Sequence, residues 1–262
     1  MTLGLEGKSA LVTASSEGLG LACAARLADA GCSVAICGRR QDALDKARET
    51  LARKGSAILA QPADMADPAA LERLVAAVLQ QFGRLDILVV NSGHVDYGGF
   101  DDLSDDQWQR AFDLLLMSCV RLARLCLPAM RANRGGDIVI LGSSTAREPP
   151  PHLVLSTVMR LGVAGLAKTL ARALAPDGIR VNLVAPGYFD TGRVRKRLDG
   201  MVQESGVQRA DAIAQICGDV PMGRIGAPEE LAELVAFVVS RKAGFMTGAT
   251  ITIDGGGNRL VF

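Results

Sequence analysis

Short runs that are almost wholly apolar alternate along this chain with longer runs whose apolar residues recur at helical spacing. The short runs are rich in Val, Ile and Leu, which is typical of strands buried on both faces of a parallel sheet. They predict strands over Ser9–Thr13, Ser33–Cys37, Ser56–Gln61, Leu85–Val90, Asp137–Leu141, Ile179–Val184 and Ala249–Ile253. The longer runs predict helices over Gly18–Ala30, Gln41–Lys54, Pro68–Phe82, Ser104–Met130 and Leu153–Leu174, with a last helix opening at Pro228.

This alternation predicts βαβ units, and hence an α/β fold in which a parallel sheet of about seven strands lies between two layers of helices. No linker rich in Pro, Gly and Ser divides the chain and no internal repeat is present, so residues 1–262 are expected to form a single domain. The least regular segment is 188–224, which contains the basic run Arg193–Arg197. We expect this segment to be an insert or lid over a site.

Composition narrows the class of protein. Apolar residues make up 49% of the chain and aromatic residues only 4%, so the core must be built from aliphatic side chains. The net charge of +1 argues against binding to nucleic acid or to an anionic membrane through bulk charge. The sequence has no signal-peptide pattern and no run of about 18 apolar residues, so we expect a cytoplasmic protein without a membrane span.

Cysteine and histidine usage argues against a metal site. The six cysteines include no CxxC pair, and the chain has only two histidines. We therefore expect neither a zinc site nor a disulfide framework. The thiols are expected to be small core side chains in a reducing compartment.

The segment Thr13–Gly20, TASSEGLG, lies where the first predicted strand passes into the first predicted helix. A glycine-rich turn at this point allows backbone amides and the helix N-terminus to hold a pyrophosphate. Gly18 and Gly20 would let a phosphate approach the backbone and let the helix pack closely on the sheet. The same turn is also compatible with a tight connection that binds no ligand.

This turn and several later motifs resemble those of the short-chain dehydrogenase/reductase family, over nearly the whole chain. The family's TGxxxGxG motif reads TASSEGLG here, with Ala14 in place of the first glycine, where a methyl group is tolerable if φ is negative. Later matches are Asp64 at the adenine position, Asn91-Ser92-Gly93, Pro186-Gly187 with Thr191, Thr247-Gly248 and Asp254-Gly255-Gly256. The resemblance implies a Rossmann-type doubly wound sheet. It also implies a nicotinamide dinucleotide held by Thr13, Ser15, Ser16, Gly18, Leu19, Gly20, Arg39, Arg40, Asp64, Met65, Asn91, Ser92, Gly93, Arg160, Pro186, Gly187 and Thr191.

The residues after the second strand bear on the choice of cofactor. An acidic residue there binds the ribose hydroxyls of NAD, whereas a basic one accommodates the 2′-phosphate of NADP. Here the strand leads into Gly38-Arg39-Arg40 with no acid, which favours NADP, although NAD remains possible. One observation weighs against NADP, since Glu17 stands where NADP-using relatives often carry a base. As an alternative, Arg39 and Arg40 could only cap the next helix electrostatically.

The catalytic motif of the family is altered in this chain. The family uses an Asn, a Ser and a YxxxK pair, and here Ser143 keeps the serine position. Ser156 replaces the tyrosine, Arg160 the lysine and Leu115 the asparagine, and Leu115 is expected to remove the helix bend and water site that the asparagine supports. An aliphatic hydroxyl is a far weaker acid than a phenol of pKa ~10, and a guanidinium cannot act as a base. The resemblance therefore implies non-standard catalysis, with Ser143 and Ser156 hydrogen-bonding the substrate oxygen and Arg160 anchoring ribose or a substrate charge.

Other residues could supply the proton. Tyr188, directly after Pro186-Gly187, is the first candidate, and His94, directly after Gly93, is the second. Tyr97 and His152 lie in nearby loops, and either histidine would titrate in a useful pH range. Each of these residues could equally be part of a loop or a pocket wall.

The sequence thus predicts an NAD(P)-dependent oxidoreductase that interconverts a carbonyl and an alcohol. It resembles a 3-oxoacyl carrier-protein reductase with an atypical active site. The basic run Arg193, Arg195, Lys196 and Arg197 could steer an anionic substrate, such as a carboxylate or an acyl thioester, or could be a solvated helix face. The alternatives are a dinucleotide-binding sensor or partner without redox turnover, and a lyase or isomerase. By resemblance, a homotetramer or homodimer is expected.

Overall fold

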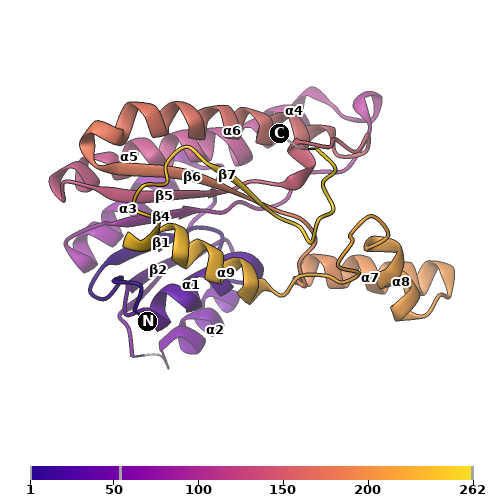
Figure 1. The fold of residues 1–262 in the computed structure, drawn as a ribbon, viewed down its shortest axis with the longest axis horizontal. Coiled ribbons are helices and arrows are strands. Elements are labelled where there is room, and N and C mark those ends of the chain that lie inside the picture. Colours follow the sequence, from indigo (N-terminus) through magenta and orange to yellow (C-terminus); the bar gives the residue numbers. More distant parts are fainter. Residues whose placement is uncertain (1, 53–54, 261–262) are drawn as a thin grey trace.

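The computed structural model describes residues 2–52 and 55–260. Within them, seven strands form one sheet in the order β3-β2-β1-β4-β5-β6-β7 (Figure 1), and every pairing is parallel. The strands are β1 Ser9–Val12, β2 Ser33–Gly38, β3 Ile58–Pro62, β4 Ile87–Val90, β5 Gly136–Leu141, β6 Ile179–Pro186 and β7 Thr250–Ile253. The strand order reverses between β1 and β4, so the predicted doubly wound parallel sheet is confirmed.

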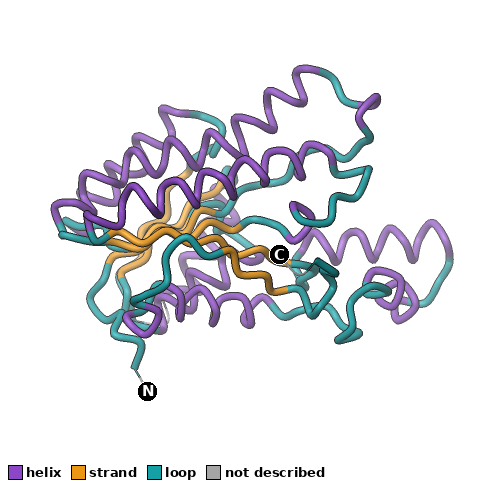
Figure 2. Tube along the Cα trace, turned by 45° about the horizontal axis from the view of Figure 1, so that its top comes forward, coloured by secondary structure: helices purple, strands orange, loops and turns teal. Residues whose placement is uncertain are grey.

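Helices cover both faces of the sheet, which confirms the predicted three layers (Figure 2). The helices α1, α2 and α9 pack on one face, and α3, α5 and α6 pack on the other. The helices are α1 Gly18–Asp29, α2 Gln41–Ala52, α3 Pro68–Phe82, α4 Asp105–Ala111, α5 Ser118–Ala132, α6 Val154–Leu174, α7 Gly192–Ser205, α8 Arg209–Ile216 and α9 Pro228–Val238. In β1, Ala10 and Val12 join one core and Leu11 joins the other, because successive strand side chains point to opposite faces.

Three predicted strands begin later than expected: the third at Ile58, the fourth at Ile87 and the last at Thr250. Just before the third strand, the Ser56 hydroxyl donates to the Ala28 carbonyl at 2.9 Å. Just before the fourth strand, the Asp86 carboxylate accepts from the Ser9 backbone N–H at 2.9 Å, and the Asp86 N–H donates to the Ser9 carbonyl at 2.9 Å. The predicted second helix is described as far as Ala52, and its expected end at Lys54 lies outside the described residues.

The predicted helix Ser104–Met130 is a helical run with a change of pitch. A π-helical segment, Phe112–Met117, lies between α4 and α5. The expectation that Leu115 removes the bend was wrong: Leu115 is buried within this segment against Leu155 and Met159 of α6. Two side chains stabilise the wider turn, because the Ser118 hydroxyl donates to the Leu114 carbonyl and the Cys119 thiol to the Leu115 carbonyl.

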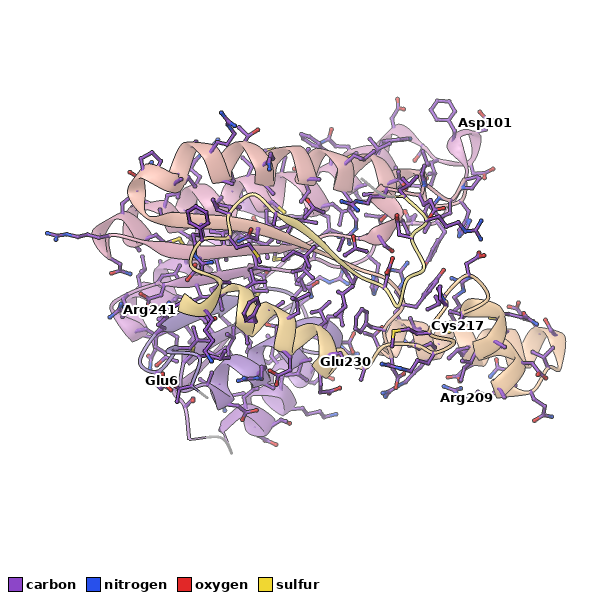
Figure 3. The ribbon with its side chains drawn as sticks, in the orientation of Figure 1. Glu6, Asp101, Arg209, Cys217, Glu230 and Arg241 are labelled. Atoms are coloured by element: carbon purple, nitrogen blue, oxygen red, sulfur yellow. The ribbon has the colours of Figure 1, made fainter. Side chains whose placement is uncertain are left out.

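The segment 188–224, which was expected to be an insert or lid, contains α7 and α8. These helices extend from the edge of the sheet where its strands end (Figure 1), and they share a small apolar core of Val194, Leu198, Ala212 and Ile216. Figure 3 shows Arg209 and Cys217 in this part of the molecule, at the opposite end from Glu6 and Arg241.

One helix in the described part of the chain, Val154–Asp177 including α6, is long and apolar enough to cross a membrane by length and composition. The core helix of a soluble protein passes the same test. Residues of α6 such as Val163, Ala167 and Ala171 are buried in the core against the sheet. The position of α6 is therefore that of a core helix of the fold.

Candidate active site

A cavity of about 650 Å³ lies at the carboxyl ends of strands β1 to β6. It is lined by the loops that follow these strands and by the start of α7. The sheet order reverses at β1 and β4, which is where open α/β sheets bind their ligands. Its volume is within the roughly 300–1,000 Å³ of small-molecule and cofactor sites.

The glycine-rich turn after β1 forms one wall of this cavity. The φ angle of Ala14 is +45°, so the condition under which its methyl group would fit without strain is not met. This conformation directs the Ala14 carbonyl toward Asn91, whose side-chain amide donates to it at 3.0 Å. A Cβ on Gly20 would lie 2.6 Å from that same carbonyl oxygen, so only glycine allows α1 to begin this close to the turn.

The predicted cofactor residues divide into two groups. Those that line the cavity are Ser16, Gly18, Leu19, Arg39, Asp64, Met65, Asn91, Ser92, Gly93, Arg160, Pro186, Gly187 and Thr191. Four others do not line it: Thr13, Ser15, Gly20 and Arg40. Thr13 and Ser15 hold the turn itself, since their hydroxyls donate to the Asn91 carbonyl at 2.7 Å and the Val12 carbonyl at 2.6 Å. Arg40 lies 3.8 Å from Asp42 of α2, as the alternative reading of the arginines predicts.

The residues present fit a dinucleotide phosphate. Gly18 has a φ of +60°, a backbone conformation that favours glycine, and a Cβ there would be in ordinary van der Waals contact with Thr191 at 3.4 Å. Such a turn at the N-terminus of α1 offers N–H groups to a phosphate. Within the described chain, Arg39 makes no ion pair, and it lines the same cavity as Ser16. Glu17, at the N-cap of α1, also lines the cavity and is the one acidic side chain on this turn.

Ser156 and Arg160 lie together on one face of α6, as their spacing predicts. The Arg160 Nε donates to the Ser156 Oγ at 3.3 Å. Its Nη1 donates to the carbonyls of Leu141 and Gly142, at 2.9 and 2.7 Å, which fixes the guanidinium to the end of β5. Burial lowers the pKa of Arg160 to about 10, with a smaller contribution from Arg193, so the group remains a cation near neutral pH.

Ser143 follows β5 and also lines the cavity. Its hydroxyl lies 2.8 Å from that of Thr145, and it accepts from the Thr145 backbone N–H at 3.2 Å. Sequence reasoning missed Thr145, although a hydroxyl residue two positions after the family's serine was visible as a signal. The cavity thus carries hydroxyl groups from Ser143, Thr145 and Ser156.

The proton-donor candidates lie in different surroundings. Tyr188 lines the cavity, and the guanidinium of Arg197 lies 5.9 Å from its ring centre. The Nδ1 of His94 accepts a hydrogen bond from Arg193 Nη1 at 2.9 Å. Partial burial, Arg193, Arg160 and Arg39 lower the pKa of His94 to about 4. His94 is therefore neutral at physiological pH, and the expectation that it titrates in a useful range was wrong.

Tyr97 and His152 pack against each other at the rim, with ring centres 6.3 Å apart. Tyr97 accepts a hydrogen bond from Arg193, while His152 is outside the cavity lining. The side chains of the basic run Arg193–Arg197 lie in different surroundings. Arg193 and Arg197 line the cavity, whereas Arg195 forms a two-bond ion pair with Asp190 at 2.7 and 2.9 Å.

The six cysteines are free and buried, as expected for small core side chains. Burial raises the pKa of Cys37 and Cys126 to about 12, so these thiols are inert. Among the described residues, no group of three or more His, Cys, Asp or Glu side chains is arranged to hold a metal ion.

Comparison with known proteins places this site in a family. The model of the family described as enoyl-(acyl carrier protein) reductase matches residues 13–258. The dehydrogenase/reductase SDR family member 4 of Caenorhabditis elegans is 34% identical over 253 residues, 96% of this chain and 95% of that one. The 3-oxoacyl-[acyl-carrier-protein] reductase of Escherichia coli is 33% identical over 254 residues, 97% of this chain and 98% of that one.

Solved structures of similar proteins support the same family. The L-sorbose reductase of Gluconobacter frateurii, complexed with NADPH and L-sorbose, has a TM-score of 0.97, 32% identity and full coverage of both chains (100% each). An NADPH-bound short-chain oxidoreductase of Pseudomonas aeruginosa, described as containing an atypical catalytic center, has a TM-score of 0.89 and 30% identity over 97% of this chain and 98% of that one. This chain therefore belongs to the short-chain dehydrogenase/reductase family. Its members are NAD(P)-dependent oxidoreductases that act on carbonyl and alcohol groups.

Proposed function

We propose that this chain is an NADP-dependent reductase of carbonyl compounds in which Ser156, polarised by Arg160, takes the place of the family's tyrosine. The observation that carries the proposal is the bond from Arg160 Nε to Ser156 Oγ at 3.3 Å. Because the hydroxyl oxygen accepts from a cation, its own proton is left to point toward another acceptor in the cavity. A substrate carbonyl oxygen is such an acceptor.

The hydroxyl groups and Arg160 would stabilise negative charge on the substrate oxygen. The bound nicotinamide supplies the hydride that converts the carbonyl to an alcohol. Ser156 donates to the oxygen as charge develops there, and Ser143 or Thr145 donates a second hydrogen bond, since only one of these two hydroxyls donates to the other. Arg160 remains a cation throughout and strengthens the Ser156 donor. Preorganised donors of this kind supply much of the rate enhancement in many enzymes.

The proton that completes the alcohol comes from Tyr188 or from water. Tyr188 carries a phenol and lines the cavity beside Pro186 and Gly187. The neutral His94 has no proton to give as an acid near neutral pH, because its pKa is about 4. We therefore place Tyr188 before His94 as the proton donor.

For the cofactor we propose NADPH, with Arg39 at the 2′-phosphate. Arg39 lines the cavity close to the turn and is free of carboxylate partners in the described chain, and NADPH is bound in the similar sorbose reductase. Ser16 and Gly18 would hold phosphate oxygens, and Asp64 would contact adenine. Arg160 would bind the nicotinamide ribose in addition to its hydrogen bond to Ser156.

Three further properties belong to this proposal. The chain is a single domain over residues 1–262, with 188–224 as a lid over the substrate end. It works in the cytoplasm without nucleic-acid or membrane partners, which suits six free buried thiols. It assembles as a homodimer or homotetramer, because Val158 and Leu161 of α6 are 44% and 53% exposed on the helix face away from the sheet.

The proposal is tested by mixing the purified protein with NADPH and a panel of ketones, acyl thioesters and sugars while following the nicotinamide absorbance. Turnover is expected. Ser156→Ala should lower kcat by about 10²–10³, the loss seen when one oxyanion-hole donor is removed. The affinity for NADPH should be unchanged in this variant, because Ser156 faces the substrate.

Binding of NADPH without turnover across the whole panel would contradict the proposal and favour a sensor or partner subunit. The double variant Ser156→Tyr with Arg160→Lys restores the family's pair and serves as the reference. If only this double variant turns over, the parent chain is not a reductase.

A further inference from the structure

Resting on the proposed reductase function, we propose that the substrate end of the cavity is an anion subsite formed by Arg193 and Arg197 of α7, with Arg160 of α6 behind them. The substrate would then be a carbonyl compound that carries a compact anionic group, either a carboxylate or a phosphate. The proposal concerns the substrate and not the cofactor, whose phosphates we place at the glycine-rich turn and at Arg39.

Positive charge in this part of the cavity lacks carboxylate partners. Five arginines line the cavity: Arg39, Arg110, Arg160, Arg193 and Arg197. Arg110 lies 3.7 Å from Asp96, whereas the other four have no carboxylate within ion-pair distance among the described residues. Glu17 and Asp64, the remaining acidic lining residues, follow β1 and β3 at the cofactor end. The substrate end therefore holds three uncompensated cations.

Two of these cations lie on one face of helix α7. Arg193 and Arg197 are four residues apart, which places them one above the other on a helix, and both line the cavity. Arg195 lies between them in sequence but points elsewhere and is neutralised by Asp190 at 2.7 and 2.9 Å. The basic run is thus not a uniformly solvated face.

Arg193 is held in place by neutral partners. Its Nη1 lies 2.9 Å from His94 Nδ1, its Nη2 donates to the Tyr97 hydroxyl, and its guanidinium lies 4.9 Å from the Tyr97 ring centre. A guanidinium has five N–H donors, so these two contacts leave donors for a ligand. The lowered pKa of His94, about 4, keeps the imidazole uncharged beside the arginine. Arg193 is therefore positioned while its charge stays uncompensated.

A compact oxyanion is the ligand that fits this arrangement. The planar guanidinium fork matches carboxylate and phosphate oxygens through two parallel hydrogen bonds. A second space of about 10 Å³, about the size of one water, is bordered by His94, Ser156, Arg160 and Arg193, so these side chains lie close together. The anionic group would thus sit close to Ser156, which the proposed function places at the substrate oxygen.

The test uses NADPH-loaded protein and matched substrate pairs. Dihydroxyacetone phosphate is compared with dihydroxyacetone, and 4-oxopentanoate with its primary amide, which separates phosphate from carboxylate. The anionic member of at least one pair should have a higher kcat/KM by about tenfold to a hundredfold, the value of one charge-assisted hydrogen bond. Arg193→Gln should remove this preference, because it should raise KM for the anionic member much more than for the neutral member. Arg195→Gln, whose side chain is paired with Asp190, is the matched control and should behave as the parent.

Three results would overturn the subsite. The first is equal kcat/KM for both members of each pair in the parent, which leaves the reductase function intact. The second is a loss of NADPH affinity in Arg193→Gln as large as the loss for the anionic substrate, since Arg193 would then bind the cofactor. The third is an equal effect of Arg193→Gln and Arg195→Gln, which would indicate general charge steering.

If no member of either pair turns over, the proposed reductase function fails for these substrates and the subsite is tested by binding alone. Calorimetry with NADPH-loaded protein then compares benzoate, inorganic phosphate and benzamide. Binding of benzoate or phosphate that Arg193→Gln abolishes and Arg195→Gln keeps would support the subsite. Equal binding of benzoate and benzamide, or no anion binding in the parent, would refute it.

Discussion

Ala14 carries a methyl group at a turn where the backbone has the left-handed conformation, with φ at +45°. In this region the Cβ of an L-residue lies too close to the neighbouring carbonyl, at a cost of roughly 1–2 kcal/mol. The strain persists because the Asn91 amide and the packing of Gly20 hold the Ala14 carbonyl in place. The cavity wall is therefore built on a strained residue.

Ala14→Gly should raise the free energy of unfolding by about 1 kcal/mol, because glycine adopts this conformation without strain. In a chain of this size, the midpoint of thermal unfolding should rise by about 2–4 °C. Scanning calorimetry measures the change. Ala30→Gly, at a position where φ is −83°, is the matched control and should be neutral or destabilising. A lower midpoint for Ala14→Gly than for the parent would contradict the assignment of strain.

At the residue scale, sequence spacing predicted part of the site. The pairing of Ser156 with Arg160 follows from helical periodicity, because residues four apart share a face. The contact between His94 and Arg193 did not, because it joins positions 99 residues apart and depends on how α7 folds over the cavity. The left-handed φ of Ala14 was also missed, since an alanine alone does not signal it. Local periodicity is readable from sequence, whereas contacts across loops depend on tertiary structure.

At the scale of elements, helix ends were predicted well where a side chain caps them. Asp67 accepts from the Ala69 N–H at 2.9 Å with Pro68 at the first turn, and Ser104 and Gln107 form a capping box. The π-helical segment before α5 was not predicted, because its pattern of apolar residues is that of an ordinary helix. The Ser118 hydroxyl and the Cys119 thiol donate to the Leu114 and Leu115 carbonyls within it.

The start of α9 depends on one carboxylate. Glu230 accepts from the Ala227 N–H at 2.7 Å and from Arg224 at 2.7 and 2.8 Å, and the Arg224 bonds are the main reason that its pKa falls from 4.5 to about 2. The unfolded chain therefore binds more protons between these two values, so the stabilisation is complete above pH 4.5 and is lost as the pH falls toward 2.

Glu230→Gln should lower the thermal midpoint near neutral pH by a few degrees, and the loss of stability on acidification should become less steep than in the parent. Thermal unfolding across the acid range measures both effects. Glu229→Gln, at the neighbouring position in the same first turn, is the control for removing one negative charge from the helix N-terminus. Equal effects of the two variants would show that the specific bonds of Glu230 contribute nothing.

At the scale of the whole molecule, the fold was predictable because each strand is an apolar run and each helix separates two strands on the same sheet. With parallel strands and right-handed crossovers, little freedom remains for the topology. The position of the cavity followed as well, since the carboxyl ends of the strands meet at one edge. The way the segment 188–224 folds over that edge was not predictable, because α7 and α8 have a small core of their own.

The proposed assembly depends on the outer face of α6. Val158 and Leu161 lie one turn apart there and are 44% and 53% exposed, while Phe245, after α9, is fully exposed on another part of the surface. Apolar side chains grouped on one helix face are typical of an interface between subunits. The parent should therefore have a solution mass of two or four times 27.5 kDa.

Leu161→Glu should reduce that mass by at least half, because it places a charge in the contact, and light scattering after gel filtration measures the change. Thr50→Glu, on the exposed polar face of α2, adds the same charge outside the contact and should leave the mass unchanged. A parent that already runs at 27.5 kDa, or a Leu161→Glu variant with the mass of the parent, would show that α6 is not a subunit interface.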